Sequence, residues 1–409
     1  MSARNRAPQP SDRFGNQAWD GLVVIVAGVS WDDTRLSEKH LAIHLSRLVP
    51  VLYVDPAISV LTPLKKPALR SSTSGPRLRM VGANLARLTP LTVPGISRPG
   101  LRIIAAWATR RAIARAVRRL GGNVRALVVA SLDDVFGSCP GLQVMYGTDD
   151  WITGGGLMGL SSTWLRKREA AQLRRADVVV AVSDQLAARW APEARSVVVI
   201  PNGCDTDHFA AVESALPAGE VTLPDPIAGF IGHLSERIDL DALEMIAETG
   251  ASLLLIGPRQ TTFNIEKMEA LLAHPNVQWV GPQPFDRLPA FMARIAVGLT
   301  PYTDSDFNRG SDPLKTLEYL SAGKPAVVSD LPSVRRIPQD LVHVCSTPEA
   351  FAERTLEVLG RPPDPALAQR RRHYAASQNW DARARDFVAL FSNGHPVPTD
   401  DLSARHSDG

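Results

Sequence analysis

Short apolar runs rich in β-branched residues alternate with helical patterns along most of this chain. The run LVVIVAG at residues 22–28 has no polar position, which is typical of a strand buried on both faces of a parallel sheet. A helical pattern at 37–48 and a second apolar run, VLYVDP at 51–56, follow it. A strand, a helix and a strand at this spacing predict a parallel βαβ unit. The fold class is therefore α/β.

The alternation continues in two blocks, separated by a Pro- and Ala-containing interval at 213–226. The first block has apolar runs at 125–131, 143–147, 177–183 and 196–203, and the second has IAGFIG, SLLLIG, VQWVG, VGLTPY and PAVVS. A chain of 409 residues is long enough for two cores, because single cores stop growing at roughly 250–300 residues. We predict two Rossmann-like, doubly wound parallel-sheet domains that face a central cleft, where open sheets bind ligands.

The predicted organisation follows from where the runs and the polar intervals lie. It comprises a disordered tail at 1–19, an acceptor-binding first domain at 20–205, a linker at 206–224, a nucleotide-sugar-binding second domain at 225–375, a helix at 376–393 that crosses back to the first domain, and a disordered tail at 394–409.

Cysteine content and hydropathy restrict the cellular setting. Three scattered cysteines are too few for a disulfide framework or a zinc site of clustered sulfurs. No apolar run approaches the roughly 18 residues needed to span a bilayer, and the first residues do not resemble a signal peptide. We expect a cytoplasmic protein, with possible peripheral contact to the inner face of the cell membrane.

Charge is distributed unevenly along the chain. Residues 1–210 carry 27 Lys and Arg against 16 Asp and Glu, and 14 basic residues lie between Asp55 and the next acid, Asp133. We expect this basic region, about 60–125, to meet an anionic partner. Within it, 101–121 is predicted to be a helix with arginines around an apolar side. The apolar positions on or near that side are Ile103, Ile104, Trp107, Ile113 and Val117.

Such a helix can lie on an anionic membrane surface. A solvated helix on the back of the first sheet is the alternative. Nucleic acid is not expected as a partner, because no recognition motif or aromatic-interleaved basic platform is present.

The stretch SDPLKTLEYLSAGKPAVVSD at 311–330 predicts a ligand-binding helix. Asp312 is a suitable N-cap, Pro313 suits the first turn, and Gly323 is expected to end a helix over 313–322. Lys315 and Glu318 share one face. Because the helix follows the strand VGLTPY, its free amides and Lys315 are placed to meet a diphosphate, and Glu318 a ribose. An ordinary surface ion pair is the alternative.

Four segments in this order carry a family resemblance. They are 168–190, IPNGCDTDHF at 200–209, GFIGHLSERIDLDAL at 229–243 and PLKTLEYLSAGKPAVVS. Together they resemble the nucleotide-sugar-dependent glycosyltransferases of the GT-B fold, family 4-like (glycosyl transferases group 1). The resemblance implies a UDP-, GDP- or dTDP-sugar as co-substrate and no bound metal. The donor-nucleotide contacts that it implies are Gly232, His233, Arg237, Pro313, Leu314, Lys315 and Glu318.

The sequence departs from the family pattern at residue 310. Many members carry a glutamate eight positions before the one that matches Glu318, and here that position is Gly310. Polar residues of the preceding loop are candidates for recognition of the donor sugar instead, namely Asp306, Asn308, Arg309 and Ser311. A simple polar connection is the alternative.

The first domain offers candidates for the acid–base group and the acceptor site. YGTDDWITGGG at 146–156 follows an apolar strand, and either Asp150 or Asp149 is predicted to take the proton of the acceptor hydroxyl. A turn cap is the alternative role. The predicted acceptor contacts are Trp31, Asp32, Arg35, His40 and Trp151. His40 and His44 lie one turn apart, and packing is an alternative role for both.

The resulting hypothesis is a hexosyltransferase-like enzyme. It would move a sugar from a nucleotide-diphosphate sugar to a membrane-associated glycan or lipid-linked acceptor, in cell-envelope polysaccharide or glycolipid synthesis. The alternatives are a catalytically silent GT-B protein that binds a glycan or a partner, and a GT-B nucleotide-sugar epimerase or hydrolase. The family likeness favours retention of the anomeric configuration, whereas an aspartate base in the first domain would suit inversion.

Overall fold

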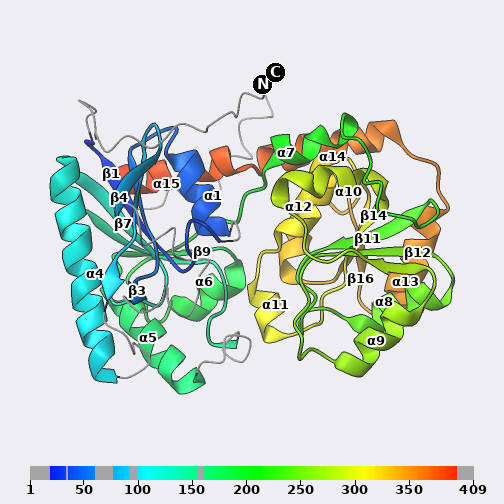
Figure 1. Cartoon of the computed structure of the whole chain (residues 1–409), viewed down its shortest axis with the longest axis horizontal. Coiled ribbons are helices and arrows are strands. Elements are labelled where there is room, and N and C mark those ends of the chain that lie inside the picture. Colours follow the sequence, from blue (N-terminus) through cyan, green and yellow to red (C-terminus); the bar gives the residue numbers. More distant parts are fainter. Residues whose placement is uncertain (1–18, 34–35, 60–76, 93–98, 154–160, 394–409) are drawn as a thin grey trace, which may run out of the picture.

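The computed structural model describes residues 19–33, 36–59, 77–92, 99–153 and 161–393. Within them the chain forms two α/β units side by side, each built on its own sheet (Figure 1). The predicted fold class, with two mainly parallel sheets, is confirmed.

The first sheet has eight strands in the order β10-β9-β8-β7-β1-β2-β5-β4. Its neighbouring strands are parallel except for β4 and β5, which pair antiparallel at one edge. The strands are β1 (Leu22–Ala27), β2 (Val51–Val54), β4 (Leu78–Gly82), β5 (Leu85–Leu88), β7 (Val124–Ala130), β8 (Leu142–Gly147), β9 (Val178–Ala181) and β10 (Val197–Val199). Two short strands, β3 (Ile58–Ser59) and β6 (Leu91–Thr92), pair separately.

The helices of this unit are α1 (Ser37–Leu45), α4 (Pro99–Leu120), α5 (Ser162–Arg175) and α6 (Asp184–Trp190). The last helix of the chain, α15 (Trp380–Asn393), packs against α1 and contributes Trp380 and Phe387 to the first core (Figure 1). The helix α15 is therefore part of the first core.

The second sheet has six parallel strands in the order β13-β12-β11-β14-β15-β16. They are β11 (Ile227–Ile231), β12 (Ser252–Ile256), β13 (Val277–Trp279), β14 (Ile295–Thr300), β15 (Ala326–Ser329) and β16 (His343–Cys345). The helical segments are α7 (Thr206–Ala210), η3 (Ala211–Glu213), α8 (Leu240–Glu248), α9 (Ile265–Ala273), η4 (Phe285–Arg287), α10 (Leu288–Arg294), α11 (Asp306–Gly310), α12 (Leu314–Ser321), η5 (Pro332–Arg336), α13 (Pro348–Leu359) and α14 (Pro365–Ser377).

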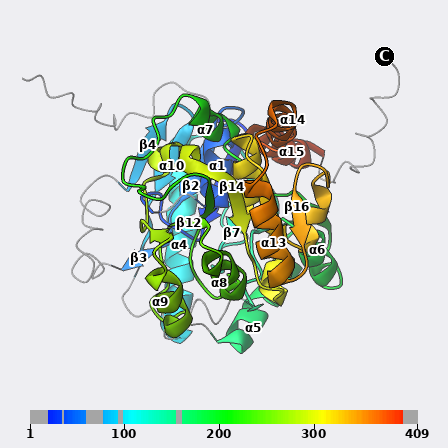
Figure 2. The ribbon, with the colours of Figure 1, turned by 90° about the vertical axis from the view of Figure 1, so that its right-hand side faces the viewer.

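Alternate residues of the second sheet enter two separate cores, as the period of two in a strand requires. Ile227 and Ile231 pack with α7, α10, α12 and α14 on one face, and Ala228 and Phe230 pack with α8, α9 and α13 on the other. Figure 2 shows α8, α9 and α13 on the side of this unit away from α7, α10 and α14. The sheet is therefore covered on both faces, which explains its continuous apolar strands.

Tyr319 attaches α12 to this sheet. Its hydroxyl accepts a hydrogen bond from the Ile231 amide at 2.9 Å and lies 3.2 Å from the Gly229 carbonyl oxygen. A Cβ atom at Gly298 would lie 2.2 Å from the Tyr319 ring, so a glycine is needed beneath it. The helix that carries Lys315 and Glu318 therefore has a fixed position over the carboxyl ends of β11 and β14.

Three features differ from the sequence-based expectations. Trp19, placed in a tail, is 2% exposed and belongs to the first core. The segment 206–224, expected to be a linker, contains α7 and supplies Phe209 and Val221 to the second core. Antiparallel β4 and β5 were not expected, because Arg87 interrupts the apolar pattern of β5.

Candidate active site

Arg237, on the loop after β11, is held in place by the loop that contains α11. Its Nε donates to Asn308 Oδ1 at 2.9 Å and its guanidinium to Ser311 Oγ at 3.1 Å. The same guanidinium lies over the rings of Tyr302 and Phe307. These contacts fix a cation at the carboxyl end of the second sheet, facing the first domain.

Asn308 and Ser311 therefore have a bracing geometry. Asn308 is fully buried, and its amide donates to the carbonyl oxygens of Arg237 and Thr303. Ser311 is 3% exposed and donates to the Asn308 carbonyl oxygen at 2.9 Å. Both were expected to contact the donor sugar, but their hydrogen-bonding groups are engaged with protein.

The other two predicted sugar contacts are exposed. Arg309 forms a bidentate ion pair with Asp304, at 2.5 and 2.6 Å. Asp306 begins α11 and lies on its exposed side. Both side chains can reach a ligand between the domains.

The helix predicted to bind the nucleotide starts one residue later than expected. Pro313 is the N-cap of α12, and the helix runs from Leu314 to Ser321. Asp312 does not cap it, because its Oδ2 accepts from the backbone amide of Asn202, at 2.8 Å, on the segment that leaves the first domain. Burial raises the pKa of Asp312 to about 6. Asp312 therefore ties the two domains together instead of starting the helix.

Lys315 and Glu318 form an ion pair with Nζ–Oε distances of 2.9 and 3.1 Å. The Glu318 side chain is 7% exposed and the Lys315 side chain 26%. Burial alone would lower the pKa of Lys315, but the Glu318 carboxylate outweighs it and the pKa is raised. The two residues share a face, as expected, in a setting far less exposed than an ordinary surface pair.

The glycine-rich turn after β11 is set by close backbone packing. A Cβ atom at Gly257, whose φ is +135°, would lie 1.9 Å from the carbonyl oxygen of Gly232. Next along the turn, burial lowers the pKa of His233, and the Arg237 guanidinium adds to the effect. A neutral His233 therefore lies beside the cation.

The two predicted acids of the first domain have different environments. Asp150 is 5% exposed and its Oδ1 accepts from the amides of Ile152 and Thr153, each at 3.0 Å. Its Oδ2 is ion-paired with Arg189, which also binds Glu169. The turn-cap alternative thus describes the contacts of Asp150.

Asp149 has different partners, since its carboxylate is hydrogen-bonded to Thr148 and lies near the Arg237 guanidinium. Burial raises the pKa of its carboxyl group to about 6, against the lowering effect of nearby Arg237. The pKa of Asp149 therefore lies closer to neutral pH than that of an ordinary aspartate.

Sequence reasoning missed a third acid, Glu38, in the first turn of α1. It is 4% exposed and accepts a hydrogen bond from the Gly28 amide at 3.2 Å. Burial is the main cause that raises its pKa to about 7, and the charge of Asp149 adds to the rise. A lone glutamate in a first helical turn looks like an ordinary partner of the helix dipole. The sequence alone therefore does not indicate that Glu38 is buried and has a raised pKa.

The predicted acceptor residues do not gather in one place. Trp31 packs edge-on to Tyr53, with ring centroids 5.0 Å apart, and Asp32 binds Arg87 at 2.8 Å. Trp151 is 8% exposed within the first core, and His40 is 5% exposed between the domains. The fifth, Arg35, lies outside the described residues.

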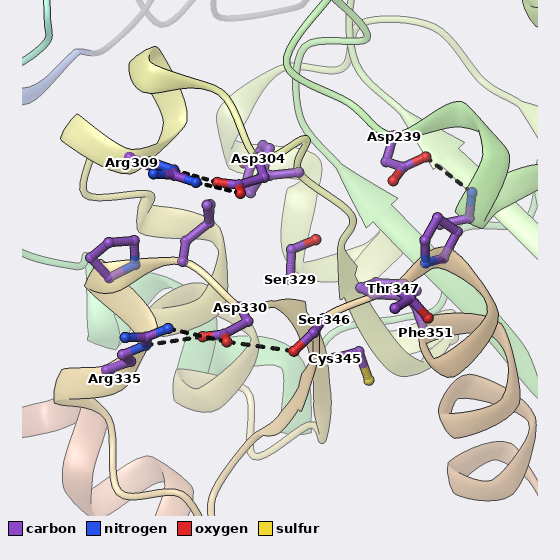
Figure 3. A pocket seen from close by; sticks show the side chains of 15 residues that line it. Asp239, Asp304, Arg309, Ser329, Asp330, Arg335, Cys345, Ser346, Thr347 and Phe351 are labelled. Atoms are coloured by element: carbon purple, nitrogen blue, oxygen red, sulfur yellow. Dashed lines mark hydrogen bonds and ion pairs between the residues drawn. The ribbon is translucent and has the colours of Figure 1, made fainter.

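Two cavities are lined by residues from these parts of the two domains. One, of about 420 Å³, is bounded by Asp150 and Arg189 of the first domain and by Asp306, Arg309 and Gly310 of the second. The other, of about 390 Å³, lies in the second domain at the ends of β14, β15 and β16. Figure 3 shows its two Arg–Asp pairs and the hydroxyl groups of Ser329, Ser346 and Thr347. Lys315 and Glu318 line neither cavity.

Comparison with known proteins gives a family match. Residues 225–361 match the family model described as Glycosyl transferases group 1. A Bacillus subtilis protein, provisionally named as the teichuronic acid biosynthesis glycosyltransferase TuaH, is 30% identical over 262 residues, which are 60% of this chain and 66% of that protein. The match to the glycosyl transferases group 1 family thus lies in the second domain, and the alignment spans less than two thirds of the length of the curated relative.

Solved structures agree with this glycosyltransferase assignment at the level of the fold. The sucrose-phosphate synthase of Thermosynechococcus elongatus is 17% identical with a TM-score of 0.67, over 91% of this chain and 98% of that one. Anabaena HepE in complex with UDP and glucose is 12% identical with a TM-score of 0.59, over 91% of this chain and all of that one.

Gly310, where the sequence departs from the family pattern, lies at a contact between the two domains. A Cβ atom there would lie 3.4 Å from Leu186 and 3.6 Å from the Cβ of Asp150, both in the first domain. The Gly310 carbonyl oxygen accepts from Ser183 Oγ at 2.6 Å. A glutamate side chain would enter this contact and place a second carboxylate beside Asp150.

In the part of the chain that the structure describes, no helix of this glycosyltransferase has the length and apolar character needed to cross a bilayer.

Proposed function

We propose that the protein transfers a sugar from a nucleotide-diphosphate sugar to a glycan or lipid-linked acceptor at a membrane surface, in cell-envelope polysaccharide or glycolipid synthesis. The observation that carries the proposal is the approach of Arg237 to Asp149. A fixed cation of the second domain lies near a half-buried carboxyl group of the first, close enough to lower its pKa. The Arg237 guanidinium is suited to a leaving diphosphate, and the Asp149 carboxylate is suited to take the proton of a hydroxyl nucleophile.

In the proposed reaction, the acceptor oxygen bonds to C1 of the sugar and the bond from C1 to the phosphate oxygen breaks. The acceptor hydroxyl loses its proton to the Asp149 carboxylate, and the electron pair of the broken bond leaves with the nucleoside diphosphate. A pKa of about 6 leaves Asp149 mostly ionised at neutral pH and close to the operating pH, as general base catalysis favours. Arg237 offsets the charge of the departing diphosphate.

We assign the nucleotide end of the donor to α12 together with Gly232 and His233. The backbone amides of Leu314 and Lys315 are at the amino end of the helix, where a phosphate is favoured. Lys315 adds a full charge, and Glu318 is suited to accept the ribose hydroxyls.

Isothermal titration with UDP, GDP and dTDP tests the donor assignment. Lys315→Met is expected to weaken the preferred nucleotide about 10- to 100-fold, since a charge-assisted bond is worth roughly 1.5–3 kcal/mol. Lys267→Met is the matched control, because Lys267 is also paired with an acid, Asp241, but on an exposed surface. Unchanged affinity in Lys315→Met would remove α12 from the donor site.

The membrane part of the proposal rests on the outer face of α4. Its side chains Ile103, Ile104 and Trp107 are 74%, 46% and 59% exposed. Arg111 and Arg115 are exposed further along. The five apolar residues expected on one side are divided, since Ile113 is fully buried and Val117 half-buried. At 100° per residue, Ile113 lies about 120° from Trp107 around the helix axis.

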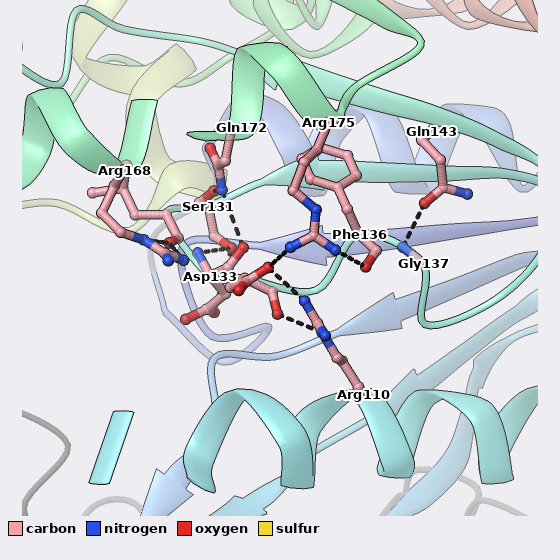
Figure 4. A network of polar contacts seen from close by, with 11 residues as sticks. Arg110, Ser131, Asp133, Phe136, Gly137, Gln143, Arg168, Gln172 and Arg175 are labelled. Carbon is pink, nitrogen blue, oxygen red and sulfur yellow. Dashed lines mark hydrogen bonds and ion pairs between the residues drawn. The ribbon is translucent and has the colours of Figure 1, made fainter. Parts of the chain in front are cut away.

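An arginine of α4 anchors the helix to the domain. Arg110 donates to the carbonyl and carboxylate oxygens of Asp134, at 2.8 and 2.5 Å, and Arg175 of α5 binds the same carboxylate. Figure 4 shows these two arginines converging on the loop after β7. The exposed apolar residues and arginines therefore belong to a helix with a fixed orientation, suited to the surface of an anionic bilayer.

Sedimentation with vesicles of phosphatidylglycerol, against vesicles of phosphatidylcholine, tests the membrane part. Ile103→Ser with Trp107→Ser is expected to reduce binding to the anionic vesicles at least 10-fold, because each buried apolar side chain contributes about 1.5–3 kcal/mol. Leu216→Ser is the control, since Leu216 is 87% exposed elsewhere. Equal binding by all variants would exclude α4 as the contact.

A panel of nucleotide sugars separates the remaining functions. Nucleotide release that depends on an added glycan or lipid-linked acceptor supports transfer. Release without acceptor indicates a hydrolase, interconversion of the donor indicates an epimerase, and binding without turnover indicates a silent binding protein.

A further inference from the structure

Three potential metal ligands meet where the two domains join. One side-chain atom from each of His40, His44 and Asp205 lies within 4.8 Å of the others. The histidines are 5% and 7% exposed on α1 and one turn apart, which places both on one face of the helix. Asp205 comes from the segment that leaves the first domain, directly before α7.

His44 has the second partner typical of a metal-binding histidine. Its Nδ1 lies 2.7 Å from the carboxylate of Asp381 on α15, which is also bound by Arg47 at 2.9 Å. A carboxylate accepts a proton from the ring nitrogen, so Nδ1 carries the hydrogen and Nε2 keeps its lone pair. Carboxylate partners of this kind orient metal-ligating imidazoles.

The other two side chains also have fixed settings. The His40 ring stacks on Trp380, with centroids 5.4 Å apart and planes 4° from parallel. Asp205 follows Cys204, whose amide donates to the Gln378 carbonyl oxygen at 2.9 Å. Asp205 is the N-cap of α7, yet its carboxylate makes no capping hydrogen bond. The backbone next to Asp205 is thus held by a hydrogen bond, whereas the Asp205 carboxylate makes no hydrogen bond that caps the helix.

We propose that His40, His44 and Asp205 bind one zinc ion, with a water molecule as fourth ligand. Two imidazoles and one carboxylate suit zinc better than magnesium or calcium, which prefer oxygen ligands. Zinc bond lengths of about 2.0–2.2 Å place tetrahedral ligand atoms about 3.3 Å apart, so the three side chains close by small rotations when the ion binds.

The ion has a structural role at the domain junction. None of the three residues lines the cavities described above, and the expectation that the transfer reaction uses no metal is unaffected. Zinc joins α1 of the first domain to the segment that leads into the second, and limits how far the two separate. The inference is independent of the proposed function.

Equilibrium dialysis of the full chain without a histidine tag, after treatment with a chelator, tests the site with zinc alone. We expect one zinc per chain in the wild-type protein, and at least 10-fold weaker binding in Asp205→Asn and His44→Gln. Cobalt is expected to give the intense visible absorption of a tetrahedral site in the wild type but not in Asp205→Asn or His44→Gln. Asp381→Asn, which removes the carboxylate partner of His44 and of Arg47 but no zinc ligand, is expected to weaken zinc binding about 10- to 100-fold.

The matched controls are Asp207→Asn, an exposed acid one position into α7 from Thr206, and His274→Ala, a histidine paired with Glu244 in the second domain. Both are expected to bind zinc like the wild type. The proposal is overturned if the wild type retains no stoichiometric zinc, or if Asp205→Asn binds it as tightly as Asp207→Asn. Because the Asp205 side chain caps nothing, folding of Asp205→Asn is not at risk, and that variant decides the question.

Discussion

Replacing Asp149 with asparagine is expected to make the protein more stable at neutral pH while removing most of its activity. Burial raises the pKa of Asp149 from 3.8 to about 6. Each pKa unit corresponds to about 1.4 kcal/mol, so keeping this carboxylate ionised costs the folded state about 3 kcal/mol near pH 7. Asparagine has nearly the same shape without the charge, and the variant recovers up to that amount.

The pH dependence gives this prediction a specific sign. The folded-state pKa lies above the unfolded value, so the stabilising contribution of Asp149 is fully present below about pH 4. It is lost as the pH rises through about 6. The difference in stability between Asp149→Asn and the wild type is therefore largest above pH 7 and vanishes near pH 4.

Urea unfolding at pH 7.5 and pH 4 measures the stability difference, and initial rates between pH 5 and 8 measure the activity. We expect kcat/KM to fall about 10²- to 10⁴-fold, the usual contribution of a general base. The acidic limb near pH 6 should disappear in the variant.

Asp150→Asn is the control at the neighbouring residue, and its expected effect on stability has the opposite sign. Its carboxylate binds two backbone amides and Arg189, so loss of its charge should destabilise the protein by about 1–3 kcal/mol at pH 7.5. The burial argument would be wrong if Asp149→Asn were less stable than the wild type at pH 7.5. It would also be wrong if the difference in the free energy of unfolding between the two proteins were the same at pH 7.5 and pH 4. Full activity in that variant would exclude Asp149 as the base.

The remaining predictions concern the second domain. Arg237→Met removes the cation that lowers the pKa of Asp149, so the acidic limb of the rate profile should move above pH 6; an unmoved limb would separate the two residues. Gly310→Ala should be tolerated, because its Cβ meets Leu186 at an ordinary 3.4 Å, whereas Gly310→Glu should lower both the thermal midpoint and kcat/KM; a gain in activity would contradict the packing argument. Gly257→Ala should cost on the order of 3 kcal/mol or more in thermal unfolding, since its Cβ would lie 1.9 Å from a carbonyl oxygen; a stable variant would show that the turn can relax.

The sequence predicted those elements that depend on local pattern. The buried parallel strands were recognisable because no polar residue interrupts them, as in β1 and β12. β5 was not recognisable, because Arg87 is buried in it at 1% exposure through an ion pair of 2.7 Å with Asp55, 32 residues earlier. The basic region that was expected to meet an anionic partner therefore includes an arginine in the core. A buried arginine can be placed only once its partner strand is known.

The same limit applies to the site. Asp312 looks like an N-cap because its usual partners are the following amides, but here the amide of Asn202, 110 positions away, replaces them. Asp149 and Asp150 are adjacent in sequence and cannot be distinguished by pattern. Their difference arises from Arg189, which takes the carboxylate of Asp150 and leaves that of Asp149 beside Arg237.

One short loop sets both halves of the proposed reaction centre. Asn308 and Ser311 hold the guanidinium of Arg237, and between them the Gly310 carbonyl oxygen accepts from Ser183 of the first domain at 2.6 Å. In Figure 1, α11 of this loop lies between the two sheets, next to α6. The loop that contains α11 is thus bonded to the first domain through Ser183 and holds Arg237 of the second domain. It thereby fixes the distance from Arg237 to Asp149. Separation of the domains must break the Ser183 bond before it can move that cation. A glutamate side chain at position 310 would have to fit between Leu186 and Asp150 at this contact, and the glycine avoids that crowding.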